Sequence, residues 1–110
     1  MKNKRAVIIF SGYNERAIIA FMRTLESNGV SYAVIASSKK DQIFKTKYSS
    51  KILAVREFAS IEKADLARCI KEVDAILGAE EYIISPSTEY LNRYLIDNVD
   101  YFNNQRCIIP

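Results

Sequence analysis

The residues best suited to chemistry lie in residues 81–97, which have the sequence EYIISPSTEYLNRYLID. A short apolar run is followed there by Pro86, by the hydroxyls of Ser87 and Thr88, and by the carboxylate of Glu89. Hydroxyl groups can donate hydrogen bonds to a bound small molecule, and a carboxylate can accept them from its hydroxyl, amine or amide groups. This segment is therefore the first candidate binding site, and Glu89 is its principal residue.

A second polar turn, Ser11-Gly12-Tyr13-Asn14, follows the first apolar run of the chain. Asn14 is a good N-cap for the helical pattern that begins there. Arg16 falls in the first helical turn, where a cation is unfavourable to the helix dipole, so Arg16 is a candidate for contact with a ligand or partner. A single glycine falls short of the GxGxxG fingerprint, and no dinucleotide site is predicted.

Each candidate also has a purely structural interpretation, which stays open at this point. A carboxylate in the first turn of a helix is favoured by the dipole, so Glu89 could serve only as a cap. Ser87 and Thr88 are better explained as caps than as nucleophiles, because the sequence offers no paired base. For Arg16 the alternative, which we favour, is a place on the solvated surface.

The composition argues against several kinds of chemistry. There is no histidine, which removes imidazole general-base catalysis and the commonest metal ligand. Cys69 and Cys107 fit no metal or disulfide spacing and are predicted to be reduced, partly buried thiols. No catalytic or metal-ligating residue is predicted. No apolar run approaches the roughly 20 residues of a membrane span, so we expect a cytoplasmic protein with no membrane partner.

Charge is unevenly distributed along the chain. Residues 39–51 contain five lysines and one aspartate, whereas residues 57–100 contain ten acidic and four basic residues. The basic segment could contact phosphates, but one tyrosine and one phenylalanine are interleaved and no nucleic-acid motif surrounds it. We therefore favour a solvated loop, and nucleic acid is not the partner that the sequence predicts.

Five apolar runs, separated by helical patterns or polar connections, must position these residues. The runs occupy residues 6–10, 31–36, 52–55, 82–85 and 107–109. This alternation predicts an α/β fold, a three-layer, mostly parallel sheet of about five strands with helices on both faces. In the common order 3-2-1-4-5, strands one and four are neighbours whose helices leave on opposite faces. The two polar turns would then form the lips of a crevice suited to an anionic or polyhydroxylated small molecule.

The helical patterns also predict which side chains face the sheet. The expected inward residues are Ile18, Met22 and Leu25, widened by Ile19 and Phe21, in the first helix; Ile61, Ala64, Ala67, Ile70, Val73 and Leu77 in a second helix that starts near Ser60; and Tyr90, Leu91, Tyr94 and Leu95 in the third. The polar residues 37–50 and 97–106 are expected to have no regular structure.

Three stretches support a family resemblance: FSGYNERAIIAFMRTLESNGVSYAVIA, KYSSKILAV and YIISPSTEYLNRYL. With them the chain resembles the N-terminal domain that precedes the ATP-grasp fold in carboxylate–amine ligases and carbamoyl-phosphate-synthase-like proteins. The resemblance implies that Gly12, in the glycine turn, and Glu89, after the proline, help to bind the non-nucleotide substrate. It also implies that ATP and magnesium bind to other domains, so residues 1–110 would hold no cofactor and would not be catalytic alone.

On this interpretation residues 1–110 form a single pre-ATP-grasp-like domain, and we expect a fragment of a longer chain because the sequence stops directly after an apolar run. Its expected partners are downstream ATP-grasp domains and a small-molecule substrate, and a homodimer is also possible. The alternative is a stand-alone Rossmann-like module that binds a small anion or a partner protein.

Overall fold

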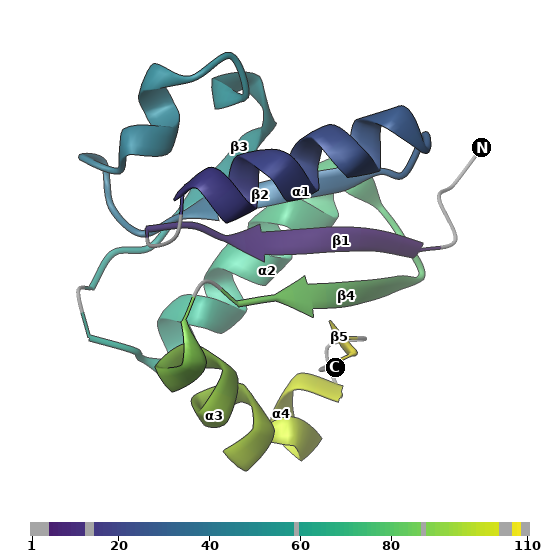
Figure 1. Ribbon diagram of the computed structural model, residues 1–110. Helices are drawn as coiled ribbons and strands as arrows, with labels where there is room; N and C mark the ends of the chain where they lie inside the picture. The colour runs from purple at the N-terminus through teal and green to yellow at the C-terminus, as the bar shows by residue number, and fades with distance from the viewer. Residues whose placement is uncertain (1–4, 13–14, 59, 87, 104–106, 109–110) are drawn as a thin grey trace.

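The computed structural model describes residues 5–12, 15–58, 60–86, 88–103 and 107–108 (Figure 1). The strands are β1 (Arg5–Phe10), β2 (Tyr32–Ala36), β3 (Ile52–Val55), β4 (Glu81–Ser85) and β5 (Cys107–Ile108). The helices are α1 (Glu15–Ser27), α2 (Lys63–Leu77), α3 (Glu89–Asp97) and α4 (Val99–Asn103), with two short 3₁₀ helices, η1 (Gln42–Lys45) and η2 (Ser49–Lys51).

The strands form one sheet in the order β3-β2-β1-β4-β5, and every neighbouring pair is parallel. The predicted fold class and strand order are confirmed. The central strands β1 and β2 are buried on both faces, which is why their sequences are continuous apolar runs instead of alternating ones. All carboxyl ends therefore lie at one edge of the sheet, here called the carboxyl edge.

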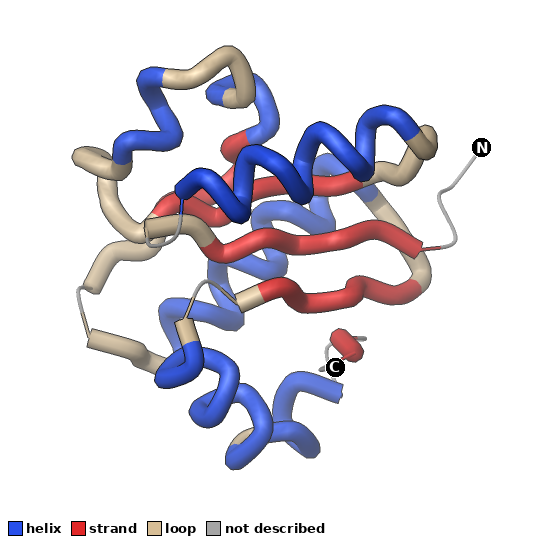
Figure 2. Tube along the Cα trace, in the orientation of Figure 1, coloured by secondary structure: helices blue, strands red, loops and turns tan. Residues whose placement is uncertain are grey.

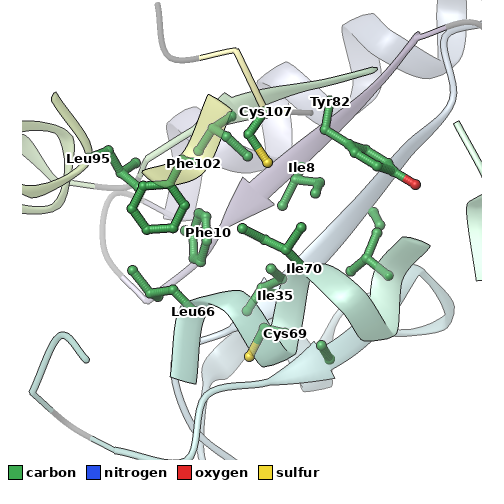
Figure 3. Packing of buried hydrophobic residues seen from close by; sticks show 14 of the residues in the cluster. Ile8, Phe10, Ile35, Leu66, Cys69, Ile70, Tyr82, Leu95, Phe102 and Cys107 are labelled. Atoms are coloured by element: carbon green, nitrogen blue, oxygen red, sulfur yellow. The ribbon is translucent and has the colours of Figure 1, made fainter. Parts of the chain in front are cut away.

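Helices cover both faces of the sheet (Figures 1 and 2). One face packs with α1 and includes Val7, Ile9, Ile18, Met22, Leu25, Tyr32, Val34, Ala36, Ile43 and Tyr48. The other face packs with α2, α3 and α4 and includes, among others, Ile8, Phe10, Ile35, Leu66, Ile70, Tyr82, Leu95 and Phe102 (Figure 3). The chain reaches β2 and then β3 by connections on the first face of the sheet. It returns to β4 through α2 on the second face, as right-handed crossovers require.

Eight of the fifteen predicted inward residues are buried, four are half-buried and three are exposed. Phe21 is 37% exposed and Tyr90 is 71% exposed, and Ala64 also lies in solvent. Tyr90 precedes the buried Leu91 by one residue, and one residue is about 100° around a helix, so both cannot face the core. The helix expected near Ser60 begins at Lys63.

The prediction that residues 97–106 are irregular is wrong for the part described, because α4 forms at Val99–Asn103. Its residue Phe102 is 0% exposed and lies beside Leu95 and Phe10 in the core on the α2 face of the sheet (Figure 3). A helix of five residues is too short to show a helical period in the sequence.

The expectation for residues 37–50 is also wrong, because they contain η1 and most of η2. Ile43 and Tyr48 are buried and join the core beneath α1. This segment takes the place that a crossover helix occupies in other βαβ units, and it closes that side of the core between β2 and β3.

Replacing Phe102 with alanine tests the role of α4. Because this side chain is fully buried, we expect the Phe102→Ala variant to lose about 3–5 kcal/mol of unfolding free energy. Urea denaturation followed by circular dichroism measures the loss. Tyr90→Ala is the matched control, since it removes an exposed aromatic from the neighbouring helix and should change stability by less than about 0.5 kcal/mol. Equal losses in the two variants would contradict the assignment.

Candidate functional site

The carboxyl edge brings the two predicted turns together. Ile9 pairs with Ser85, so the turn after β1 and the turn after β4 leave from adjacent strands, about 4.8 Å apart. The first leads into α1 on one face, and the second leads into α3, whose Leu91 and Leu95 pack on the other face. The topological switch point thus lies between β1 and β4, where α/β proteins bind their ligands.

The structure describes four of the seven predicted site residues at least in part. Gly12 lies in the turn after β1, Arg16 is exposed in the first turn of α1, and Thr88 precedes α3. Glu89 is the first residue of α3, and its side chain is outside the described part. Tyr13, Asn14 and Ser87 lie outside the described residues altogether.

Thr88 is the N-cap of α3. Its backbone is extended, and its hydroxyl oxygen accepts a hydrogen bond from the N–H of Leu91 at 3.1 Å. This is the geometry of a helix N-cap, and it supports the structural interpretation of Thr88. The cap holds the first residues of α3 at the carboxyl edge, and Glu89 begins the helix there.

Gly12 is required by the packing of the turn. Its φ is 124°, a conformation that residues with a side chain rarely adopt. A Cβ atom at this position would lie 2.8 Å from Cβ and 2.9 Å from Oγ of Ser37, which directly follows β2. The backbone of the β1 turn therefore lies directly against the β2 turn, which is a structural reason for the glycine.

Asp41 holds these two turns together. Asp41 is 7% exposed, and one oxygen of its carboxylate, Oδ2, accepts hydrogen bonds from Ser11 Oγ at 2.5 Å, Ser37 Oγ at 2.8 Å and Ser37 N at 2.9 Å. The other oxygen, Oδ1, accepts one from the N–H of Ile43 at 3.0 Å and caps η1. This role could not be predicted from the sequence, in which Asp41 is the single acid among five lysines.

The hydrogen bonds of Asp41 determine its ionisation. Burial alone would raise the pKa of this carboxyl, but the donors from Ile43, Ser11 and Ser37 stabilise the anion and hold the pKa below its ordinary value. Both oxygens are therefore used inside the protein. We assign Asp41 as a brace that fixes the turns and not as a ligand-binding group.

Asp65 has the same function at the end of β3. Asp65 is 4% exposed, and its carboxylate accepts hydrogen bonds from the N–H groups of Glu57 at 3.1 Å and Phe58 at 3.2 Å. Arg68 Nη2 lies 2.8 Å from it and also donates to the carbonyl of Val55 at 2.9 Å. Burial raises the pKa of Asp65, and the hydrogen bonds from Arg68, Glu57 and Phe58 outweigh it and lower the pKa.

The cysteines do not offer a nucleophile at this edge. Both are buried, and burial raises the pKa of Cys69 to about 11, so its thiol is protonated at neutral pH. Among the described residues, no group of three or more potential ligands could hold a metal ion.

An open groove of about 540 Å³ lies elsewhere, on the solvent face of α2 beside α4. It is lined by Ala64, Ala67, Arg68, Lys71, Glu72, Ala75 and Tyr101, and Lys63 Nζ lies 4.9 Å from the centre of the Tyr101 ring. None of the predicted site residues belongs to this groove.

No protein-family model, curated protein or solved structure gives a match to this chain. Within the described residues, no helix has the length and apolar character that crossing a membrane requires. The geometry of the carboxyl edge is therefore the main basis for a functional proposal.

Gly12→Ala tests the contact between the two turns. A new Cβ would be strained by the positive φ and would collide with Ser37, so we expect a loss of about 2 kcal/mol or more in unfolding free energy. Gly29→Ala is the control, since Gly29 also has positive φ but has open space around it and should lose only about 1 kcal/mol. A Gly12 variant as stable as the control would show that the turns are not in contact.

Asp41→Asn tests the brace. Asparagine is neutral and its NH2 group cannot accept hydrogen bonds, so the variant cannot accept all four. We expect it to lose about 1–3 kcal/mol of unfolding free energy at neutral pH. The folded pKa of Asp41 lies below the ordinary 3.8, so its stabilisation is present above that value and is lost as the pH falls through the folded pKa. The stability difference between wild type and variant should therefore shrink below about pH 3.8 in urea titrations. A difference independent of pH would contradict an ionised brace.

Proposed function

We propose that this chain is the N-terminal, substrate-side domain of an ATP-dependent carboxylate–amine ligase of the ATP-grasp type. The observation that carries the proposal is the switch point between β1 and β4, bordered by the Gly12 turn and by the capped start of α3. The strand-proline-helix segment that ends in α3 is also one of the three stretches on which the family resemblance rests.

The charges at the carboxyl edge favour a ligand that carries both an acidic and a basic or hydroxyl group. The first turn of α3 offers N–H groups and the positive end of a dipole, which suit a carboxylate or phosphate. Glu89 would accept hydrogen bonds from the amine or hydroxyl of the same ligand.

Lys39 and Lys40 extend this edge beyond the predicted residues. Both are exposed in the turn that directly follows Ser37 and β2, and so they belong to the same edge as Gly12. They favour a second candidate, in which the chain is a stand-alone module that binds a small anion without any ligase domain.

Ligand titrations distinguish the two candidates. Thermal unfolding should be followed with amino acids, dipeptides, inorganic phosphate and magnesium ATP. The ligase proposal predicts a rise in Tm with amino acids or dipeptides and none with magnesium ATP, which other domains would bind. A rise with phosphate alone would favour the anion-binding module. No change with any of these compounds would contradict both.

Glu89→Gln tests the role of the carboxylate in binding. We expect the unliganded Tm to stay within about 4 °C, because losing one charge near a helix dipole changes stability by less than about 1 kcal/mol. We also expect the Tm rise with the best amino-acid ligand to fall by at least half. Glu80→Gln, an exposed acid in the turn before β4 at the opposite edge, should keep the full rise. A Glu89 variant with lower stability and normal binding would assign Glu89 to capping alone.

A further inference from the structure

A basic lobe projects beside the amino end of α1 (Figure 1). We define it as residues 37–51, which contain η1 and η2. Its lysines are Lys39, Lys40, Lys45, Lys47 and Lys51. Four of them are exposed and Lys51 is half-buried, so the lobe presents a surface of one charge sign.

The structure removes the only negative charge from this surface. Asp41 is the one acid of the lobe, and its carboxylate is buried against Ser11, Ser37 and Ile43. In the part of the chain that is described, the ion pairs join Arg5 to Glu81 and Arg68 to Asp65 and Glu72, so no lysine of the lobe is paired with a carboxylate. The outer surface is therefore more basic than the sequence count indicates.

The lysines are held on an ordered frame. Ile43 and Tyr48 are anchored in the core beneath α1, and Thr46 Oγ1 donates to the carbonyl of Ile43 at 2.8 Å. Lys47 Nζ lies 5.4 Å from the Tyr48 ring centre, and Lys51 Nζ lies 5.1 Å from that of Tyr32. A preformed surface loses less conformational entropy when it binds than a flexible lysine-rich loop does.

One aromatic ring is exposed among these lysines. Phe44, in η1, is 39% exposed, whereas its neighbour Ile43 and the other aromatic of the lobe, Tyr48, are buried. Cationic side chains around an exposed ring are the two elements with which proteins hold single-stranded nucleic acid, through phosphates and through base stacking.

From these observations we infer that the basic lobe binds single-stranded nucleic acid without sequence preference. The lysines contact phosphates and Phe44 stacks on a base. The lobe contains no arginine, the residue that reads guanine through paired hydrogen bonds, so base selectivity is not expected. The four residues of η1 are also too few to act as a recognition helix in a duplex groove.

Other polyanions fit the lobe less well. Attachment to an anionic bilayer uses an apolar helix face or several inserted side chains, and within the lobe Phe44 is the one large apolar side chain that is exposed. An acidic protein surface would pair with the lysines but would give the exposed ring no role. The inference does not depend on the ligand at the carboxyl edge.

Fluorescence anisotropy with labelled mixed-sequence 12-nucleotide DNA and RNA tests the inference. The whole chain should bind at low salt, and log K should fall linearly with log salt. Each phosphate contact contributes about −0.7 to the slope, so the five lysines of the lobe allow a slope no steeper than about −3.5. The triple variant Lys39→Ala, Lys40→Ala and Lys45→Ala should reduce the slope by about 2. Lys63→Ala with Lys71→Ala, on the opposite face of the sheet, should leave affinity and slope unchanged.

Phe44→Ala separates stacking from charge. It should weaken binding roughly 5- to 150-fold, the range for loss of one stacked base, without changing the salt slope. Phe21→Ala, which removes a similarly exposed ring from α1, should bind normally. Circular dichroism confirms that each variant is folded.

Several results would overturn the inference. They are absence of binding at low salt, a slope near zero, or the same slope in the triple variant as in wild type. Tighter binding to a duplex of equal length, or to vesicles rich in phosphatidylserine at equal phosphate concentration, would also overturn it and assign the lobe to that partner.

Discussion

The hydrogen bonds of the Asp41 carboxylate fix the geometry of the carboxyl edge. This buried anion joins the turn after β1, the turn after β2 and the start of η1 through Ser11, Ser37 and Ile43. A buried carboxylate is costly unless donors surround it, and here four hydrogen bonds lower its pKa despite burial. Because the three segments share one acceptor, their positions are interdependent.

The sheet could be predicted from the sequence because strands buried on both faces have continuous apolar sequences, as in Ala6–Phe10. The strand order follows from handedness and from the commonest doubly wound pattern, which need no knowledge of individual contacts. Helix α4 and the 3₁₀ helices could not be predicted, because each spans less than two helical turns and is too short to show a helical period. Phe102 and Ile43 are buried residues in short, largely polar segments, and no periodicity marks them.

The candidate site was predictable only in outline. The turns after β1 and β4 could be located, since parallel strands place their carboxyl ends together, but the braces could not. Asp41 and Ser11 are 30 residues apart, and an acid among lysines has the same sequence appearance whether it faces solvent or the interior. Asp65 occupies a helical surface position by pattern, yet it accepts hydrogen bonds from Glu57 and Phe58 after β3. The bracing roles of Asp41 and Asp65 therefore depend on tertiary contacts, which the sequence does not show.

Asp41 also connects the two surfaces to which we assign binding. Gly12 lies against Ser37, Ser37 donates twice to Asp41, and Asp41 caps η1, which carries the exposed Phe44. Packed and hydrogen-bonded groups of this kind move together or lose their contacts. A ligand that displaced the Gly12 turn would have to break the Asp41 hydrogen bonds or shift η1 with the turn. The Asp41 carboxylate thus holds the two turns and the start of η1 together, and because its hydrogen bonds are internal it forms no ion pair with the described lysines of the basic lobe.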